Sequence, residues 1–384
     1  PNSDGDNAGD WYEVAAAFTD PNNPGEQPII PYPLPDPDTS TGATDKPVKV
    51  YIMSGQSNMV AFGRVSGTSP GTLHTMTNTE NKFPNLVDGG GSWTVRNDVL
   101  YRGVISAIGD AELQPGFGAS SSSFGPELGF GHVMGWYHDE PVLLIKSSIG
   151  NRSLSWDCLP PGSDSYLYNG TNYAGYGDWG NWPEGEDPPT SGTWYAGKEF
   201  DRFFTDEADW AHPEPADFNV VDILDNFSAE YPEYFSQGFE IAGYVWWQGH
   251  KDQSEPHASR YEQNMVQFIK QLRNYYENRY PSNTVPDAPF VLATIAFGGW
   301  DLSGAGLTVA NGQLAVSGDA GNYPEFVGNV KTIEARGYWR DFGPSNQGYH
   351  YNHNAETYLL TGDALGRAMV GLMDGTTPTD YDTW

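Results

Sequence analysis

Short apolar runs alternate with amphipathic stretches along most of this chain. Four runs are β-branched or aromatic and are bounded by Gly, Pro or Ser: residues 48–53 (VKVYIM), 141–145 (PVLLI), 241–247 (IAGYVWW) and 290–296 (FVLATIA). Residues 327–333 form a fifth candidate. Apolar runs of this length without polar alternation are typical of strands buried on both faces.

Helical patterns separate these runs. The clearest follows Ala258, where side chains at steps of three or four residues form one apolar stripe: Tyr261, Met265, Phe268, Leu272 and Tyr275. A last helix is predicted from about residue 355 to 373, with inward positions Tyr358, Leu359, Leu360, Ala364 and Met369. Strands that alternate with helices predict an α/β fold, with a parallel sheet covered on both faces.

Three segments lack this alternation of predicted strands and helices. Residues 1–47 are rich in Asp, Asn and Pro and form either a structureless linker or an extended strap, held on the domain by Ile29, Ile30, Tyr32 and Leu34. Residues 64–123 (Gly, Ser, Thr and Asn) and 157–218 (many Tyr and Trp) read as long loop insertions. The aromatic rings of 157–218 either stack on sugars or form a small core beneath their own loop.

Composition narrows the class of protein. The 384 residues are 38% hydrophobic and 18% charged, which suits one large domain over residues 48–384 with the tail and insertions around it. No apolar run reaches 18 residues, so we expect no membrane span. With 19 Lys+Arg against 50 Asp+Glu, the net charge of −31 repels phosphates, so nucleic acid and anionic membranes are poor partners.

Cysteine usage and local motifs bear on compartment and cofactors. Cys158 is the single cysteine, so neither an intrachain disulfide nor a thiolate metal cluster can form. The chain has no HExxH motif and no Cys/His spacing of the kind that binds a catalytic metal, so no cofactor is expected. The Asp-rich loops suggest at most a structural Ca²⁺. An acidic chain rich in Trp, Tyr, Asn and Gly suggests a secreted or periplasmic bacterial protein.

Candidate chemistry follows the predicted strands, because ligands of open α/β sheets bind at the carboxyl ends of the strands. Ser57 follows the first run in SGQSNM and is either an exposed nucleophile or only a helix cap. Gln248 follows the third run in WWQGHKD and supplies an amide donor, while His350 and His353 precede the last helix. A hydroxyl, an imidazole base and an oxyanion donor together indicate acyl transfer.

Five ordered blocks carry a family resemblance. GQSNM, FGPEL (124–128), LIKSSIGNRSL (144–154), WWQGHKDQ and GYHYN…GDALGRAM resemble the sialate O-acetylesterase-like branch of the SGNH (GDSL-like) hydrolases. The resemblance covers residues 48–156 and 236–373. It implies a three-layer α/β/α sandwich with a flavodoxin-like parallel sheet and carbohydrate acetylesterase activity.

The same resemblance implies roles for single residues. Ser57 matches the nucleophile, and its backbone N–H, together with Gly125 and Gln248, matches the oxyanion hole. His350 matches the general base, with His353 as the alternative.

One position departs from the family pattern. Many relatives carry Asp three residues before the His, and this chain has Gln347 there. Either another carboxylate orients the imidazole, or a carbonyl does so in a Ser-His dyad; the candidate carboxylates are Asp341, Asp252 and Glu334. Glu127 of the GPE block is taken as structural.

The expected function is therefore removal of O-acetyl groups from a carbohydrate by a serine esterase, through an acetyl-enzyme. The net charge favours a neutral glycan over a strongly anionic one. Arg152 and Arg64 either bind substrate bidentately or pair with carboxylates. A non-catalytic carbohydrate-binding protein on an esterase scaffold is the alternative, motivated by the aromatic insertion and the missing Asp. A glycosidase with paired carboxylates has no ordered motif behind it, and the sequence does not indicate an oligomeric state.

Overall fold

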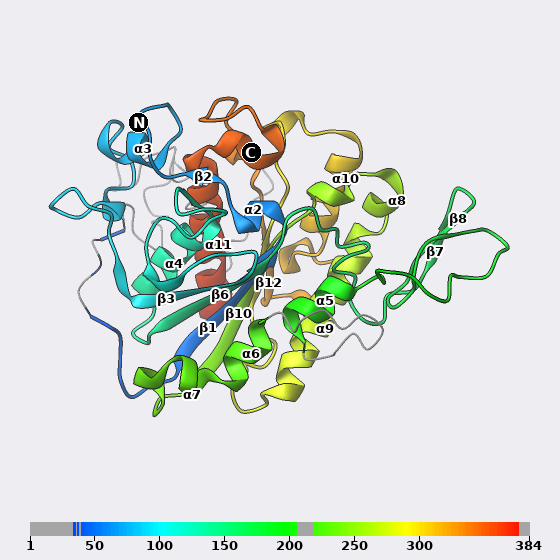
Figure 1. Ribbon diagram of the computed structural model, residues 1–384, viewed down its shortest axis with the longest axis horizontal. Helices are drawn as coiled ribbons and strands as arrows, with labels where there is room; N and C mark the ends of the chain where they lie inside the picture. The colour runs from blue at the N-terminus through cyan, green and yellow to red at the C-terminus, as the bar shows by residue number, and fades with distance from the viewer. Residues whose placement is uncertain (1–33, 36, 38–39, 206–217, 376–384) are drawn as a thin grey trace.

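The central element is a seven-stranded sheet with the order β12-β11-β10-β1-β6-β3-β4 (Figure 1). The computed structural model describes residues 34–35, 37, 40–205 and 218–375. All neighbouring strands are parallel except β3 and β4. The strands are β1 (Val48–Gly55), β3 (Arg96–Ile105), β4 (Asp110–Leu113), β6 (Val142–Ser148), β10 (Phe239–Trp247), β11 (Phe290–Ala293) and β12 (Val330–Ile333).

Helices cover both faces, so the domain is a three-layer α/β/α sandwich, as expected (Figure 1). One face packs against α3 (Leu73–Asn78), α4 (Pro126–Tyr137) and α11 (Ala355–Asp374). The other packs against α5 (Lys198–Phe204), α6 (Val220–Asp225), α9 (Tyr261–Arg279) and α10 (Gly304–Ala315). Side chains of β1 alternate between the two cores, with Tyr51 and Met53 in one and Val50 and Ile52 in the other.

Shorter elements lie in the connections. These are α2 (Ser57–Val60), α7 (Phe227–Glu230), α8 (Glu255–Ala258), β2 (Gly63–Arg64), β5 (Ser123–Phe124), β7 (Tyr166–Tyr168), β8 (Thr171–Tyr173) and β9 (Trp182–Pro183). The 3-10 turns are η2 (Pro84–Leu86), η3 (Pro232–Tyr234), η4 (His250–Asp252), η5 (Gly299–Asp301), η6 (Gly318–Ala320), η7 (Pro324–Phe326), η8 (Arg336–Tyr338) and η9 (Gly348–His353). No described helix is long and apolar enough to cross a membrane.

The five expected strands and both expected helices are present, with small differences. The last helix spans Ala355–Asp374, and all five of its predicted inward side chains are buried. In α9, Tyr276 rather than Tyr275 completes the buried stripe. Segment 64–123 differs from the expected loop, because it contributes β3 and β4 to the central sheet.

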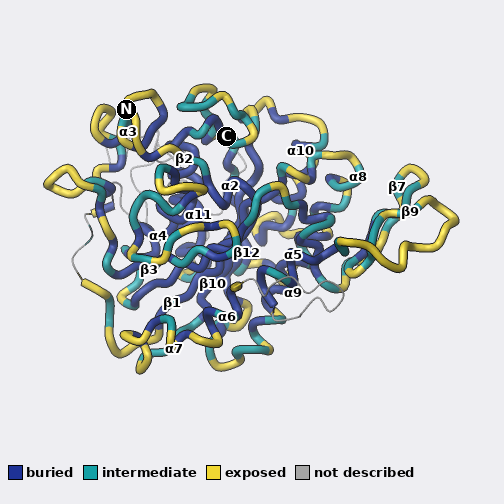
Figure 2. The backbone as a smooth tube through the Cα atoms, in the orientation of Figure 1, coloured by how far each residue is buried: buried dark blue, intermediate teal, exposed yellow. Residues whose placement is uncertain are grey.

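The aromatic insertion forms a three-stranded arm, β7-β8-β9, that projects from the domain with an exposed outer surface (Figures 1 and 2). Tyr166 and Tyr173 stack on each other at 5.3 Å, and the Tyr166 hydroxyl donates to the Pro256 carbonyl. The Arg260 guanidinium lies over the Tyr166 ring. These contacts attach the arm to α8 and to the residue that follows it closely, Arg260.

Part of the amino-terminal segment lies against the domain. Leu34 is buried in the core beside α4 and α11. The Ala43 and Lys46 carbonyls both accept hydrogen bonds from the Gln237 side chain at 2.8 Å. Ile29, Ile30 and Tyr32 lie outside the described residues.

A buried ion pair lies between the sheet and α4. The Lys146 ammonium on β6 donates to Glu127 Oε2 at 2.9 Å, to the Phe117 carbonyl at 2.9 Å and to the Val60 carbonyl at 3.4 Å. Glu127 Oε1 accepts the Gly125 N–H at the start of α4. Burial lowers the pKa of Lys146. The pair thus joins β6 to α2, to the segment before β5 and to α4, and Glu127 has the structural role expected of it.

Helices α4 and α11 cross in backbone contact. A Cβ on Gly362 would lie 2.2 Å from the Pro126 carbonyl oxygen, and one on Gly129 would lie 2.5 Å from the Asp363 amide. Real Cβ atoms do not approach this closely, so both positions require glycine.

Replacing Lys146 by Met should lower the free energy of unfolding by about 3–5 kcal/mol, because the Glu127 carboxylate would be left buried without its cation. Urea denaturation followed by circular dichroism measures the change. Lys270→Met is the matched control: Lys270 pairs with Glu325 at the surface, where solvent screens the pair, so a far smaller loss is expected. Equal losses in the two variants would contradict the role given to Lys146.

Candidate functional site

Ser57 lies at the carboxyl edge of the sheet, directly after β1. Strands β10 and β6 flank β1 on its two sides, so the loops that follow all three meet at one place, the reversal point of the strand order. Gly55 makes the turn possible, because a Cβ there would lie 2.1 Å from the Trp247 carbonyl oxygen. Ser57 is the first residue of α2 and is 9% exposed, so only a small part of it reaches solvent.

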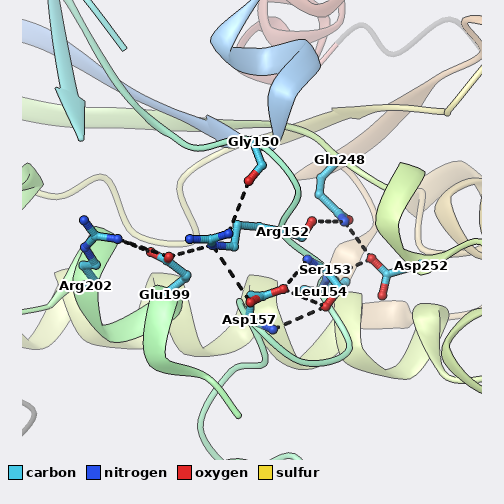
Figure 3. A network of polar contacts seen from close by, with 9 residues as sticks. All are labelled: Gly150, Arg152, Ser153, Leu154, Asp157, Glu199, Arg202, Gln248 and Asp252. Atoms are coloured by element: carbon cyan, nitrogen blue, oxygen red, sulfur yellow. Dashed lines mark hydrogen bonds and ion pairs between the residues drawn. The ribbon is translucent and has the colours of Figure 1, made fainter. Parts of the chain in front are cut away.

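Gln248 holds three of the surrounding loops together (Figure 3). Its amide nitrogen lies within hydrogen-bond distance of Gln56 Oε1 (3.1 Å), the Arg152 carbonyl (2.9 Å) and Asp252 Oδ2 (2.6 Å). Its amide oxygen accepts the Tyr261 hydroxyl. Both amide hydrogens are therefore engaged within the protein, and in this arrangement Gln248 fixes the turn that precedes Ser57.

The second expected oxyanion donor is also engaged, since the Gly125 N–H donates to Glu127 Oε1 at 2.7 Å. The oxyanion roles of Gly125 and Gln248 stay predictions. Each role requires the N–H donor to leave its present acceptor and to donate to the oxyanion. The backbone N–H of Ser57 has no acceptor among the residues that the structure describes. Gly150 lies beside the nucleophile position: a Cβ there would be 3.9 Å from Ser57 Cβ.

The segment that carries His350 is bound directly to the Ser57 turn. Asn58, the residue after Ser57, donates to the Tyr349 carbonyl at 3.2 Å and accepts the Tyr358 hydroxyl at 2.7 Å. The Tyr358 hydroxyl also lies 3.3 Å from the His350 carbonyl. The structure thus brings two residues almost 300 positions apart in sequence to one edge. No hydrogen bond joins the Ser57 and His350 side chains in the described structure, and such contacts often tighten only when substrate binds.

Both histidines contact one glutamine. His350 Nδ1 lies 3.1 Å from Gln347 Oε1, and His353 Nε2 lies 3.2 Å from the same oxygen. Phe62, which follows α2, stacks on the His350 ring with the centroids 3.9 Å apart and the planes 11° apart. Orientation by a carbonyl, one of the two expected arrangements, is therefore the one that the geometry presents.

The three candidate carboxylates have other partners, and none makes a hydrogen bond to His350 or His353 within the described structure. Asp252 accepts the backbone N–H groups of residues 154 and 155. Asp341 accepts the indole N–H of Trp339, and Glu334 accepts from Thr294 and pairs with Arg336.

The electrostatic surroundings of the histidines favour the neutral imidazole. Burial, and then the neighbouring His353 and His250, lower the pKa of His350 to about 4. Burial and Arg64 lower the pKa of His353, and burial and Lys251 lower that of His250. These neighbours are cations or other imidazoles, so none of them stabilises an imidazolium.

Arg152 and Arg64 differ from each other. Arg152 pairs with the buried Glu199 at 2.6 Å and lies over the Trp194 ring, so the ion-pair interpretation is confirmed for it (Figure 3). Arg64 is exposed, donates to the Ser122 hydroxyl and has no carboxylate partner among the described residues. Lys251 is likewise exposed, and its backbone N–H donates to Gln56 Oε1.

Three residues of this site received no role from the sequence patterns. Phe62 lies just after α2, whereas Asn58 and Gly150 lie inside the GQSNM and LIKSSIGNRSL blocks, and all three contact the Ser57–His350 region. For Asn58 and Gly150, their position within these blocks was the only available signal. Within the described part of the chain, no group of three or more His, Cys, Asp or Glu side chains is arranged to hold a metal ion.

Comparison with known proteins gives structural likenesses only. No family model and no curated protein sequence matches the chain. A protein from Arabidopsis thaliana aligns over 85% of this chain and 98% of its own, with 17% identity and a TM-score of 0.45. A carbohydrate acetylesterase from Xanthomonas citri aligns over 85% of this chain and 57% of its own, with 11% identity and a TM-score of 0.44. NanS aligns over 76% and 78%, with 13% identity and a TM-score of 0.40.

An NMR titration of the histidine imidazoles should give His350 a midpoint near pH 4, because its burial and its two imidazole neighbours disfavour the charged form. An exposed imidazole, which titrates near pH 6.5, is the reference. Assignment by the spectrum of His350→Asn identifies the signal. A midpoint at or above 6.5 would contradict the geometry, because it would require a negative group next to the ring.

Proposed function

We propose that this protein is a serine esterase that removes O-acetyl groups from a carbohydrate through an acetyl-enzyme intermediate. The observation that carries the proposal is the joining of the Ser57 turn to the His350 segment through Asn58, Tyr349 and Tyr358. It brings a hydroxyl, an imidazole and the unengaged N–H of Ser57 to the carboxyl edge of the sheet.

The chemistry follows from these groups. With Nδ1 directed at Gln347, the Nε2 lone pair of His350 accepts the Ser57 proton while Oγ attacks the acetyl carbon. The negative charge on the carbonyl oxygen is stabilised by the Ser57 N–H, with Gly125 and Gln248 as the further donors. The imidazolium then protonates the departing sugar oxygen, leaving acetyl-Ser57. His350 next deprotonates a water molecule that attacks this ester, and acetate leaves as Ser57 regains its proton.

A neutral acetylated glycan is the proposed substrate, since the net charge of −31 disfavours strongly anionic polymers. Arg64 and Lys251 offer donors to sugar hydroxyls beside the reacting ester. The aromatic arm gives little support to a purely sugar-binding protein, because the rings of Tyr166 and Tyr173 face α8. We also propose that the protein is exported from the cell.

Ser57→Ala should lower acetate release from acetylated xylan and from p-nitrophenyl acetate by at least about 10³-fold, because no acetyl-enzyme can form. Ser54→Ala is the matched control: its buried hydroxyl on β1 has no hydrogen-bond partner, so little activity should be lost. Full activity in Ser57→Ala would refute the nucleophile. An inactive wild type on all acetyl esters tested would favour the binding-protein alternative.

The base is tested by comparing two single variants. His350→Ala should remove nearly all activity, whereas His353→Ala should reduce it less, because only His350 adjoins Tyr349, whose carbonyl is bonded to the residue after Ser57. The measurement is kcat/KM on p-nitrophenyl acetate at pH 7. Activity that survives in His350→Ala and is lost in His353→Ala would reverse the assignment.

A further inference from the structure

The loop before α11 contains an amide group with two imidazoles on one oxygen. Gln347 Oε1 lies 3.1 Å from His350 Nδ1 and 3.2 Å from His353 Nε2, both within normal hydrogen-bond range. An amide oxygen is only an acceptor, so both ring nitrogens that face it are donors. His350 must then carry its proton on Nδ1, which leaves Nε2 with a free lone pair.

We propose that Gln347 is a positioning residue, whose single amide oxygen holds His350 in the tautomer that can act as a base. The proposal rests on the esterase function proposed above and adds to it the residue that replaces the missing carboxylate.

A glutamine can present either end of its amide to a neighbouring ring. If the amide turned over, its NH₂ group would face His350 Nδ1 and favour the opposite tautomer. The same turn would require His353 to move its proton from Nε2 to Nδ1. The tautomers of the two imidazoles are thus coupled through Gln347, and the face of Phe62, stacked against both rings, restricts their rotation.

An uncharged acceptor changes how the base titrates. A carboxylate at this position would stabilise the imidazolium, whereas an amide oxygen does so only weakly. The other charged or titratable groups around the histidines are Tyr349 from η9, His250 and Lys251 from η4 and Arg64 from β2, and none is a carboxylate. The active, neutral form of His350 is therefore retained into acid solution, and kcat/KM should fall only as the pH drops through about 4.

Three variants test the proposal. Gln347→Ala should lower kcat by about 10- to 100-fold, the range seen when a group that holds a histidine is lost, with KM nearly unchanged. Gln347→Glu supplies a carboxylate and should raise the acid midpoint of the pH profile by at least about one unit. Gln237→Ala is the control, because Gln237 also makes two hydrogen bonds but lies before β10, at the opposite edge of the sheet.

A second readout does not depend on activity. The ¹⁵N chemical shifts of His350 report which ring nitrogen is protonated at pH 7. We expect the Nδ1–H form in the wild type and in Gln237→Ala, and a mixture of both forms in Gln347→Ala. An Nε2–H form in the wild type, or the same tautomer in Gln347→Ala as in the wild type, would overturn the proposal.

The two proposals fail in different ways. If the wild type releases no acetate, the esterase function fails, and the tautomer measurement still decides the role of Gln347. If the wild type is active and Ser57→Ala is not, but Gln347→Ala matches Gln237→Ala in kcat and Gln347→Glu leaves the pH profile in place, only the positioning role is refuted.

Discussion

The carboxyl edge of the sheet depends on the ion pair between Lys146 and Glu127. Neither side chain reaches solvent, so each charge is tolerated only because the other lies 2.9 Å away and backbone groups satisfy the rest. The pair joins strand β6 to the last residue of α2, to the segment before β5 and to the first turn of α4. Three segments that follow different strands thereby share one fixed point.

Pattern reading located the parallel strands because their side chains are apolar on both faces, and it located α9 and α11 because their stripes are periodic. It missed β3, whose buried residues include Arg96 and Asp98, a charge pair hidden by mutual hydrogen bonds. It missed α4 as a helix because its Gly-rich sequence is apolar on every side. Motif spacing pointed to Ser57 and His350, but no spacing could show that His353 contacts the amide of Gln347.

The charge around the histidines also differs in sign from the net charge of the chain. The chain has 50 carboxylates, yet the groups that act on the three imidazoles are Arg64, Lys251 and one another. Nearby acids are already engaged: Asp252 holds backbone amides, and Glu199 holds Arg152. A strongly acidic surface is therefore compatible with a local environment in which a neutral histidine persists.

The glycine contacts between α4 and α11 have a consequence for mutations remote from the chemistry. Helix α4 begins directly after Gly125, and α11 begins two residues after His353, so the crossing at Gly129 and Gly362 sets how far apart these two starting points lie. A methyl group added at the crossing would displace one helix axis and carry its first turn with it. Such a variant would keep every proposed reacting group, and its defect at the site would be one of spacing between them.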